Sequence, residues 1–460
     1  MLNHTEALNC VQRTTTIDAS LCQLIEAYRA DYLDFFLKEF EKHHRPQYKG
    51  AYANINSVTG LHYDHHHCYS WTDGRTLGEL SALSLASSGS PESVKAYADH
   101  LHGVLMERYQ LNGWFPHVVN DETNLAVDHP MNVRVKPGES SFSHVFVLNG
   151  LFQYGLAFDD EMAVTLAGHL LGDLEQSLSE GTFIEEPTIR PAGETAQGPF
   201  MISLGAIADV LETLACLRRR GLDAQQQRVK LLLSLGRQCL KYIIGNHYRP
   251  RDHAFWEVNQ NGQPLHARQG CVVTDPGHTL EFTGFAARFS AFLEPAEREE
   301  MLQICRHIFR WVARRGFHPA CDLIYKSIDR DTGAPLLNET VGDISAVVSA
   351  EVLERHFGGQ GQAASVSTFP WWVPMELLAA GSILRHGDLT GEIDEYLLRA
   401  AKGIFRYYPN SRIGGLCYQN VGDGFFDYID IPPATPTLDL MHSHRSMRVC
   451  LREVGLSCSL

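Results

Sequence analysis

One short pattern recurs six times along this chain of 460 residues, and it constrains the fold more than any other feature of the sequence. Each copy consists of aromatic or β-prone residues followed by a polar turn. The copies begin at Gly50, Gly113, Gly181, Ala254, Asp322 and Gly414. The first five begin 63, 68, 73 and 68 residues apart, and the last gap is 92 residues. Each gap is long enough for two helices, so the repeating unit is a large helical hairpin.

The stretches between the copies have the periodicity of buried helices. Apolar residues follow a three-and-four spacing from Val229 to Ile243, and again from Met301 to Val312. Six helix pairs predict an all-α chain that forms a single (α/α)6 barrel, or toroid, over residues 1–460, with short β-hairpin loops on one rim. An insertion at about 336–366 accounts for the longest gap and is a candidate lid or interface element. An open array of helical repeats is the alternative; only a closed barrel creates a concave central site.

The composition of the chain argues against some classes of binding partner. The formal net charge of −15, without a cluster of Lys and Arg, argues against a nucleic-acid partner. The first residues lack the apolar core of a signal peptide, and by inspection no run approaches the roughly 18 apolar residues of a membrane span. The 11 cysteines show no CxxC pair, which fits reduced thiols. We therefore expect a cytoplasmic protein with a small-molecule ligand and no membrane partner; a homodimer is left open.

The segment TDPGHTLEF, from Thr274 to Phe282, is the clearest candidate for chemistry. Its Asp-Pro-Gly reads as a turn, and the residues after it read as the first turn of a helix. On such a helix His278 and Glu281, three residues apart, share a face. The pair is either an incidental feature of a helix start or an acid–base group at the mouth of a site.

Five motifs occur in order along the chain: WTDGR (Trp71–Arg75), FSHVF (Phe142–Phe146), DPGHTLE (Asp275–Glu281), PWWVPME (Pro370–Glu376) and MHSHR (Met441–Arg445). Together they resemble the signatures of the N-acylglucosamine 2-epimerase superfamily, the sugar epimerases and isomerases built on an (α/α)6 barrel. The resemblance covers roughly residues 20 to 455. It implies a sugar 2-epimerase or aldose–ketose isomerase that needs no cofactor. Such an enzyme moves a proton at C2 of an open-chain hexose or N-acylhexosamine through an enediol or enediolate.

The resemblance also assigns roles to residues. It places His278 and His442 as the two acid–base groups, which suits histidine because its side chain titrates near neutral pH. Glu281 would be the carboxylate partner of His278. Arg75 and Arg445 would hold sugar oxygens and stabilise the negative charge that develops on O1 or O2.

Further substrate-binding residues come from the same motifs. Trp371, Trp372 and Glu376 would form part of the sugar wall, since an aromatic face suits the C–H side of a pyranose. Trp71 is a candidate of the same kind, and His144 is a candidate third titrating group facing the cavity.

Each assignment has a structural alternative. His444 competes with His442, and only His442 stands three residues before an arginine in the motif spacing. Arg75 could merely pair with Glu79 one turn later. The tryptophan pair could belong to the core.

The histidine-rich stretch His62–Cys68 is a weak candidate for a metal site, because successive neighbours in a loop cannot all point at one ion. A contact between this stretch and the substrate at the rim is favoured, and neither a metal nor a cofactor is expected.

The chain departs from the family pattern in two places. Ile202 and Gly205 stand where several bacterial members carry the His and Glu of an MHxxE segment. Gly284 stands where the family usually has Trp, and we expect this change to open the wall of the site.

Two other functions compete with the leading one. An α/α-barrel glycoside hydrolase would use two carboxylates, for which Asp275, Glu281 and Glu376 are available. A sugar-binding barrel without catalysis would follow if the departures reflect a dead site.

Overall fold

The structure is a computed structural model. It describes residues 19–43, 50, 67–86, 92–130, 132–186, 190–219, 226–267, 270–336, 368–410, 415–416, 419–421 and 440–454. The candidate insertion at 336–366 lies outside the described residues except for its first position. Of the histidine-rich stretch, only His67 and Cys68 are described.

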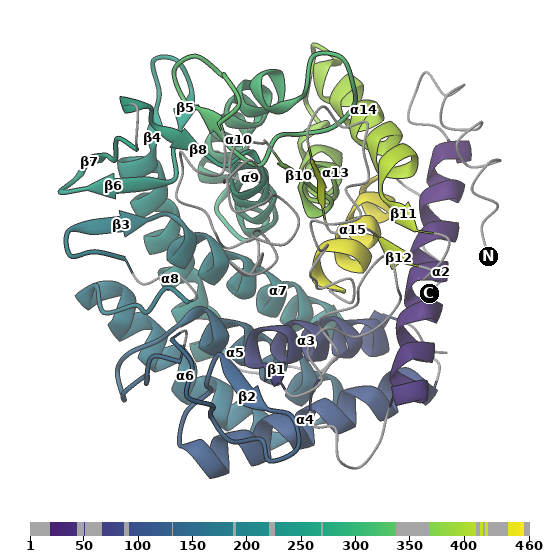
Figure 1. Ribbon diagram of the computed structural model, residues 1–460, viewed down its shortest axis with the longest axis vertical. Coiled ribbons are helices and arrows are strands. Elements are labelled where there is room, and N and C mark those ends of the chain that lie inside the picture. The colour runs from purple at the N-terminus through teal and green to yellow at the C-terminus, as the bar shows by residue number, and fades with distance from the viewer. Residues whose placement is uncertain are drawn as a thin grey trace, which may run out of the picture.

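The described helices form a closed ring of inner helices, as predicted (Figure 1). The inner helices are α3 (Ser70–Ala86), α5 (Phe142–Phe158), α7 (Gly198–Arg219), α9 (Pro276–Ser290), α13 (Trp372–Leu384) and α15 (Ser446–Glu453). Each packs against the next, and the π-helix η3 (Met441–Arg445), which leads directly into α15, packs against α3. The prediction of a closed (α/α)6 barrel is therefore confirmed, and an open array is excluded.

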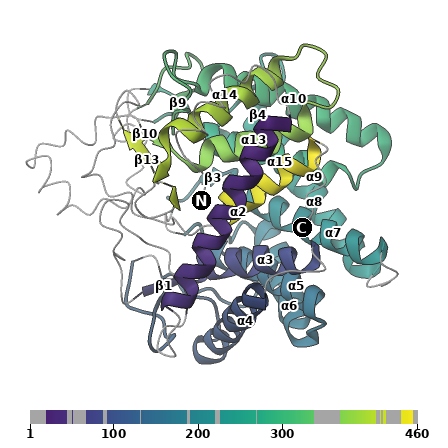
Figure 2. The ribbon, with the colours of Figure 1, turned by 90° about the vertical axis from the view of Figure 1, so that its right-hand side faces the viewer.

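A second layer of helices surrounds the ring. It comprises α2 (Ala19–His43), α4 (Glu92–Asn112), α6 (Glu161–Glu180), α8 (Gln226–His247), α10 (Pro295–Gly316) and α14 (Glu392–Tyr407). Five of these follow their inner partner directly in sequence, whereas α15 is covered by α2. Figure 2 shows α2 running across α15. The sixth helix pair thus joins segments from opposite ends of the described chain.

Glycines allow α3 and α5 to approach at backbone distance. A Cβ added to Gly74 would lie 2.6 Å from the carbonyl carbon of Phe146, and one added to Gly150 would lie 2.6 Å from the carbonyl oxygen of Gly74. Any larger residue at either position would push the helices apart. This close contact fixes the position of Arg75, the next residue along α3, against Phe146.

Helix α7 corrects one prediction from the sequence. Its segment Gly198–Arg218 is long and apolar enough to cross a membrane by length and composition. In the structure this helix packs between α5 and α9 in the inner ring, and most of its residues are buried there. Its hydrophobicity is that of a core helix.

Short antiparallel strands connect successive repeats on the rim where the inner helices begin. The pairs are β1 (His67–Tyr69) with β2 (Val118–Asn120), β3 (Glu194–Ala196) with β6 (Val258–Gln260), β8 (Val273–Thr274) with β9 (Ile328–Asp329), and β10 (Thr368–Pro370) with β13 (Gln419–Val421). Local hairpins also occur: β4 (Tyr248–Arg249) with β5 (Ala254–Phe255), β6 with β7 (Gln263–Pro264), and β11 (Pro409–Asn410) with β12 (Gly415–Leu416). The recurring elements are thus partly hairpins and partly ladders that tie neighbouring repeats together.

A buried ion pair fixes the start of α3 to the outer layer. Nη2 of Arg108 lies 2.8 Å from Oδ2 of Asp73, and neither side chain is exposed. The same guanidinium donates from Nε to Oδ1 of Asn124 at 2.7 Å and from Nη1 to Oγ of Ser70 at 3.0 Å. The aspartate of the WTDGR motif is therefore a structural residue.

The barrel interior away from the strand-bearing rim is filled by paired polar side chains. Arg288 on α9 donates to Glu212 on α7, with Nη2 and Oε2 2.9 Å apart, and also to Asp209. Asn149 on α5 donates to the other oxygen of Asp209 at 2.9 Å. The hydrogen-bonding groups of these residues are thus paired with one another.

Candidate active site

His278 stands in the first turn of α9, where its position is set by a helix cap. Oδ1 of Asp275 accepts the backbone N–H of His278 at 3.1 Å, and Pro276 occupies the first helical position. Nδ1 of His278 lies 2.8 Å from Oε1 of Glu257 and 3.5 Å from Oδ2 of Asp275. Because a carboxylate only accepts, Nδ1 carries the hydrogen and Nε2 is left for a ligand.

The two carboxylates keep a proton on His278. Burial lowers the pKa of this imidazole, but the negative charges of Asp275 and Glu257 outweigh burial and raise the pKa to about 9. Burial raises the pKa of Glu257, but His278 and the amide of Gln197 outweigh burial and lower this pKa to about 2. At neutral pH the pair is therefore an imidazolium next to a carboxylate. The side chain of His278 is 34% exposed, so it is accessible.

The prediction that Glu281 is the partner of His278 is wrong, because Glu257 takes that place. Glu281 is 2% exposed and belongs to a second cluster, in which its carboxylate, that of Glu376 and the ring of His442 have one atom each within 4.8 Å of one another. Burial, followed by repulsion from Glu376, raises the pKa of Glu281. Within the described residues, its Oε1 has no hydrogen-bond partner. The sequence correctly placed Glu281 on the helix face that points to the site, but its carboxylate lies near His442 and not beside His278 as its hydrogen-bond partner.

His442 has a carboxylate partner of its own. Its Nδ1 lies 2.8 Å from Oε1 of Glu376, and the same oxygen accepts from Nη2 of Arg445 at 2.6 Å and from Oγ of Ser446 at 3.0 Å. Burial raises the pKa of Glu376, but Arg445 and His442 lower it to about 2. Both candidate histidines thus bind a carboxylate through Nδ1.

A π-helical turn presents His442 and Arg445. The backbone N–H of Arg445 donates to the carbonyl of Leu440, five residues earlier, at 3.0 Å. Such turns often occur at functional sites because the wider register turns adjacent side chains to one face. Arg445 lies 5.0 Å from the centre of the Phe285 ring, and within the described residues its Nη1 has no hydrogen-bond partner. That donor is free for a ligand oxygen.

His444, the competing histidine of the same motif, is fully engaged in the interior. Its Nδ1 lies 2.7 Å from Oε1 of Glu79, and its Nε2 accepts from Nη1 of Arg29 on α2. Burial lowers the pKa of His444, which keeps the ring neutral. Glu79 also accepts from Nη2 of Arg448 at 2.9 Å. Glu79 is thus committed to His444 and Arg448 rather than to Arg75.

The indole of Trp372 lies next to both histidines. Its ring centre is 5.6 Å from that of His278 and 5.3 Å from that of His442. Nζ of Lys326 lies 5.2 Å from the ring centre. Trp371 is 1% exposed and meets His442 edge-on at 6.3 Å. Trp372 therefore borders both imidazoles, whereas Trp371 supports His442 from the core.

Gly277 allows this arrangement, and its substitution is testable. An added Cβ would lie 2.2 Å from Cη2 of Trp372, so Gly277→Ala must displace the indole that lies next to both histidines. We expect the variant to lose about 1–3 kcal/mol of unfolding free energy, as overpacking does. Gly245→Ala is the control, since nothing lies within 4 Å of its added Cβ and the change favours the helix. Equal thermal stability of the two variants would contradict the packing of Trp372 against Gly277.

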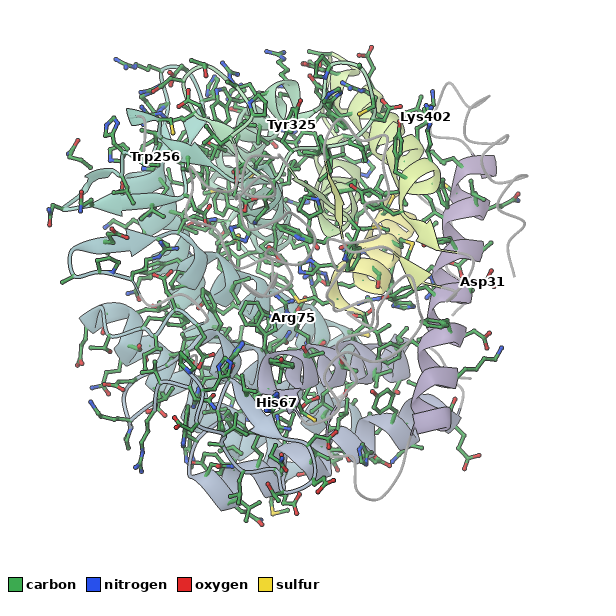
Figure 3. All side chains as sticks on the ribbon, in the orientation of Figure 1. Asp31, His67, Arg75, Trp256, Tyr325 and Lys402 are labelled. Carbon is green, nitrogen blue, oxygen red and sulfur yellow. The ribbon has the colours of Figure 1, made fainter. Side chains whose placement is uncertain are left out.

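Arg75 and Trp71 lie together on α3, which adjoins η3. The guanidinium carbon of Arg75 is 4.0 Å from the ring centre of Phe146 and 4.7 Å from that of Trp71. Figure 3 places Arg75 near the centre of the ring of helices. Trp71 is half-buried and meets His117 edge-on at 5.8 Å. Arg75 is thus held against two neighbouring aromatic rings, as a cation that projects inward.

His144 does not act as a third titrating group, which corrects the sequence prediction. Nδ1 of His144 lies 3.0 Å from Oγ of its helix cap Ser141, and the backbone N–H of Phe115 donates to Nε2 at 3.5 Å. Burial lowers its pKa to about 4. The ring is 4% exposed and neutral at physiological pH, and it holds the start of α5 against the second repeat.

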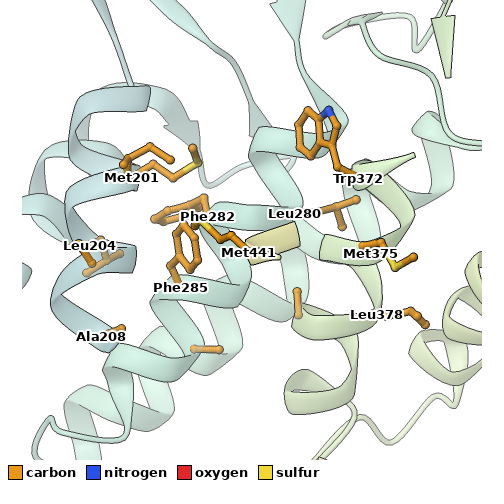
Figure 4. Close-up of a cluster of buried hydrophobic side chains, with 14 of the residues drawn as sticks. Met201, Leu204, Ala208, Leu280, Phe282, Phe285, Trp372, Met375, Leu378 and Met441 are labelled. Carbon is orange, nitrogen blue, oxygen red and sulfur yellow. The ribbon is translucent and has the colours of Figure 1, made fainter. Parts of the chain in front are cut away.

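Gly284 also differs from expectation. An added Cβ would lie 3.3 Å from Cβ of Ala380, so this position faces the contact between α9 and α13 and does not open the wall of the site. The neighbouring Phe285 fills the space in front of Gly205, whose added Cβ would lie 2.5 Å from the phenyl ring. Figure 4 shows Phe285 next to Met441 and facing the α7 residues Met201 and Leu204. An aromatic residue on α9 thus occupies the place next to the missing Glu of α7.

The sequence analysis missed a repeated position on the rim. A polar residue follows the aromatic or apolar residues in most copies of the recurring element, as in His117, Glu186, Glu257 and Lys326. Each contacts the start of an inner helix: His117 and Glu186 meet Ser143, Glu257 meets His278, and Lys326 binds Asp275. An alignment of the six copies with one another could have found this position.

Comparison with known proteins agrees with the architecture. No protein-family model matches the chain, and no curated protein matches it in sequence. Among solved structures, a D-mannose isomerase is similar over 94% of this chain and 97% of its own, with a TM-score of 0.68 and 14% identity. The cellobiose 2-epimerase of Spirochaeta thermophila DSM 6192 is similar over 96% and 99%, with a TM-score of 0.68 and 15% identity.

The fold extends to other sugar-processing proteins. An unsaturated glucuronyl hydrolase specific for heparin is similar over 94% of this chain and 98% of its own, with a TM-score of 0.53 and 10% identity. At these identities the likeness concerns the fold, which several chemistries share.

Proposed function

We propose that this protein belongs to the N-acylglucosamine 2-epimerase superfamily and is a cofactor-independent sugar 2-epimerase or aldose–ketose isomerase. One observation carries the proposal: His278 and His442 each bind a carboxylate through Nδ1, and their rings lie 5.6 and 5.3 Å from that of Trp372. Proton transfer at a carbon next to a carbonyl needs acid–base groups of this kind. The five ordered motifs and the fold shared with sugar isomerases and epimerases support it.

In the proposed reaction an open-chain aldose lies between the histidines. Nε2 of His442 takes the proton from C2, and the C–H electron pair forms the enediolate. Nε2 of His278 then gives a proton to the opposite face of C2, which yields the epimer, or to C1, which yields the ketose when the proton of O2 passes to O1. The raised pKa of His278 suits a proton donor at neutral pH.

The charge that develops on the enediolate needs donors already in place. Arg445 offers Nη1, and the buried carboxyl of Glu281, whose pKa is raised, can donate a hydrogen bond in its protonated form. The cation of Arg75 projects inward from α3, next to η3. The face of Trp372 suits the C–H side of a hexose or N-acylhexosamine.

Isotope labelling tests the reaction. The protein is incubated in deuterated water with hexoses, N-acetylhexosamines and cellobiose. A two-base epimerase gives, early in the reaction, a product carrying deuterium at C2 while the unreacted sugar stays unlabelled. An isomerase gives a ketose with deuterium at C1. His386→Asn, at a histidine with a 61% exposed side chain outside the site, should label as the parent does. Absence of label at both carbons for every sugar would overturn the proposal.

A second candidate is a glycoside hydrolase, which one observation favours. Glu281 and Glu376 are buried carboxyls with pKa values shifted apart, Glu281 upward and Glu376 downward to about 2. A raised acid facing an ionised carboxylate is the pattern of a glycosidase pair. Against it, Arg445, Ser446 and His442 all occupy Oε1 of Glu376. Release of reducing ends from oligosaccharides that survives His278→Ala and is lost in Glu376→Gln would favour the hydrolase.

Other features stay predictions. A cytoplasmic location, a homodimer and the absence of nucleic-acid and membrane partners follow from sequence reasoning alone. A sugar-binding barrel without catalysis would bind a sugar in calorimetry and leave every C–H bond unexchanged in deuterated water.

A further inference from the structure

The backbone of Glu257 is fixed by hydrogen bonds to Gln197, after β3, and to Val273 in β8. It lies between β5 and β6, and its backbone N–H donates to the carbonyl of Val273 at 3.1 Å. Its own carbonyl accepts the backbone N–H of Gln197, also at 3.1 Å. β6 pairs with β3 on one side and with β7 on the other. The backbone of Glu257 is thus held independently of α9, the helix that carries His278.

Both carboxylate oxygens of Glu257 are engaged. Oε1 binds Nδ1 of His278 at 2.8 Å, and Oε2 accepts from Nε2 of Gln197 at 3.2 Å. Gln197 is not exposed, and this second bond is partly buried. Each oxygen of this carboxylate thus already has a partner within the protein. Its influence on chemistry passes through the imidazole of His278.

We infer that Glu257 is a positioning residue of the reaction proposed above: it orients His278, fixes the tautomer that presents Nε2, and makes His278 the proton donor of the pair. The inference rests on the proposed function for its catalytic meaning. Its structural content, a charge-dependent hold on one imidazole, can be measured without any substrate.

The two histidine–carboxylate pairs differ in what surrounds the carboxylate. The oxygen of Glu376 that meets His442 is shared with Arg445 and Ser446, so a permanent cation already opposes its charge. Glu257 is held instead by a neutral amide, and Asp275 adds a second negative charge 3.5 Å from Nδ1 of His278. The electrostatic environment therefore favours a positive ring at His278.

Other charged groups face His278 from the elements packed around it. Lys326, before β9, binds Asp275 and opposes protonation of His278. Glu281, one turn along α9, also interacts electrostatically with the imidazole. Arg190 acts on Glu257 from the segment before β3. Two carboxylates within 3.5 Å of Nδ1 outweigh Lys326, and Glu257 makes the closer contact of the two.

The proton balance follows from this asymmetry. In the forward step His442 gains the proton of C2, and His278 loses its proton to C2 or C1. The pair then holds one proton as before, but on the other histidine. Return to the starting state moves a proton from His442 to solvent and from solvent to His278. No oxidant or cofactor is consumed.

The test is a titration of His278 in the full chain labelled with ¹³C-histidine. The resonance of His278 is identified as the one lost in His278→Asn. Glu257→Gln keeps an amide oxygen that can accept from Nδ1 but removes the charge. We expect the pKa of His278 to fall by about 1–3 from its value near 9. Glu194→Gln, the same change on the neighbouring strand β3, should leave the titration unchanged.

The kinetic readout distinguishes positioning from general damage. Below a pH of about 9 the parent His278 is protonated, so activity should be lost as pH rises through about 9. In Glu257→Gln this alkaline limb should move to lower pH, and kcat should fall about tenfold or more at pH 8 with KM little changed. A shift in the NMR titration without activity in the parent would disprove the proposed function, and with it the catalytic role of Glu257, and would retain only the charge-dependent hold on His278. An unchanged titration in Glu257→Gln would overturn the inference itself.

Discussion

Replacing His442 with asparagine is expected to lower kcat about 10²- to 10⁴-fold, because a general acid–base group then no longer reaches the substrate. The fold should tolerate the change. Glu376, the partner of His442, keeps its bonds to Arg445 at 2.6 Å and Ser446 at 3.0 Å, so no buried carboxylate is left unpaired. The measurement is the initial rate of epimer or ketose formation, with the thermal transition recorded for the same sample.

His444→Asn provides a matched control two residues away. His444 bridges Glu79 and Arg29 in the interior, so its loss leaves buried polar groups unsatisfied. We expect a loss of about 1–3 kcal/mol in unfolding free energy and a smaller change in kcat than for His442→Asn. The reverse result, with His444→Asn inactive and stable and His442→Asn active, would assign the acid–base role to His444.

Removing the guanidinium of Arg108 is expected to give the largest loss of stability among single changes outside the site. Arg108→Met leaves Asp73 buried with no exposed surface and without its ion partner, which lay 2.8 Å away. Breaking one side of such a pair costs about 3–5 kcal/mol, because an uncompensated charge stays in the interior. Urea unfolding followed by tryptophan fluorescence measures this as a lower midpoint.

An exposed ion pair serves as the comparison. Lys38 and Asp34 on α2 lie 2.5 Å apart, but their side chains are 66% and 59% exposed. Lys38→Met should change the unfolding free energy by no more than about 0.5 kcal/mol, because water replaces the lost contact. Equal urea midpoints for Arg108→Met and Lys38→Met would contradict the structure, in which Asp73 is isolated from solvent.

Much of the fold and site could be predicted because the signals are local. All five motifs stand at or near the start of an inner helix, where cap residues and turns are readable from a few neighbours. Asp275 caps α9 and Pro276 follows it, as the turn signature indicated. Once six helix pairs close into a ring, their starts share one rim. His278, Trp372, Glu376, His442 and Arg445 then come together without further information.

The features that the sequence did not predict depend on contacts between residues that lie far apart in the sequence. Glu257 lies 21 residues before His278, and only the strand ladder brings the two together. Glu281 and His278 share a helix face, but α13 and η3 draw Glu281 toward Glu376 and His442. Gly284 looked like a missing wall because its motif neighbours face the site, whereas it lies against Ala380 on α13. Short-range periodicity cannot say which neighbouring helix a side chain meets.

The pairing of α2 with α15 has a consequence for the order in which the protein is made. Arg29 and His444 are 415 residues apart in sequence, yet their contact joins the last inner segment to the first outer helix. During synthesis the ribosome releases α2 long before η3 exists. A nascent chain can already hold five helix pairs and His278, but it lacks His442 and Arg445. Closing so long a loop costs conformational entropy, and this cost is offset only by the contacts that form when η3 and α15 dock. The proposed pair of acid–base histidines is therefore incomplete until the ring has closed.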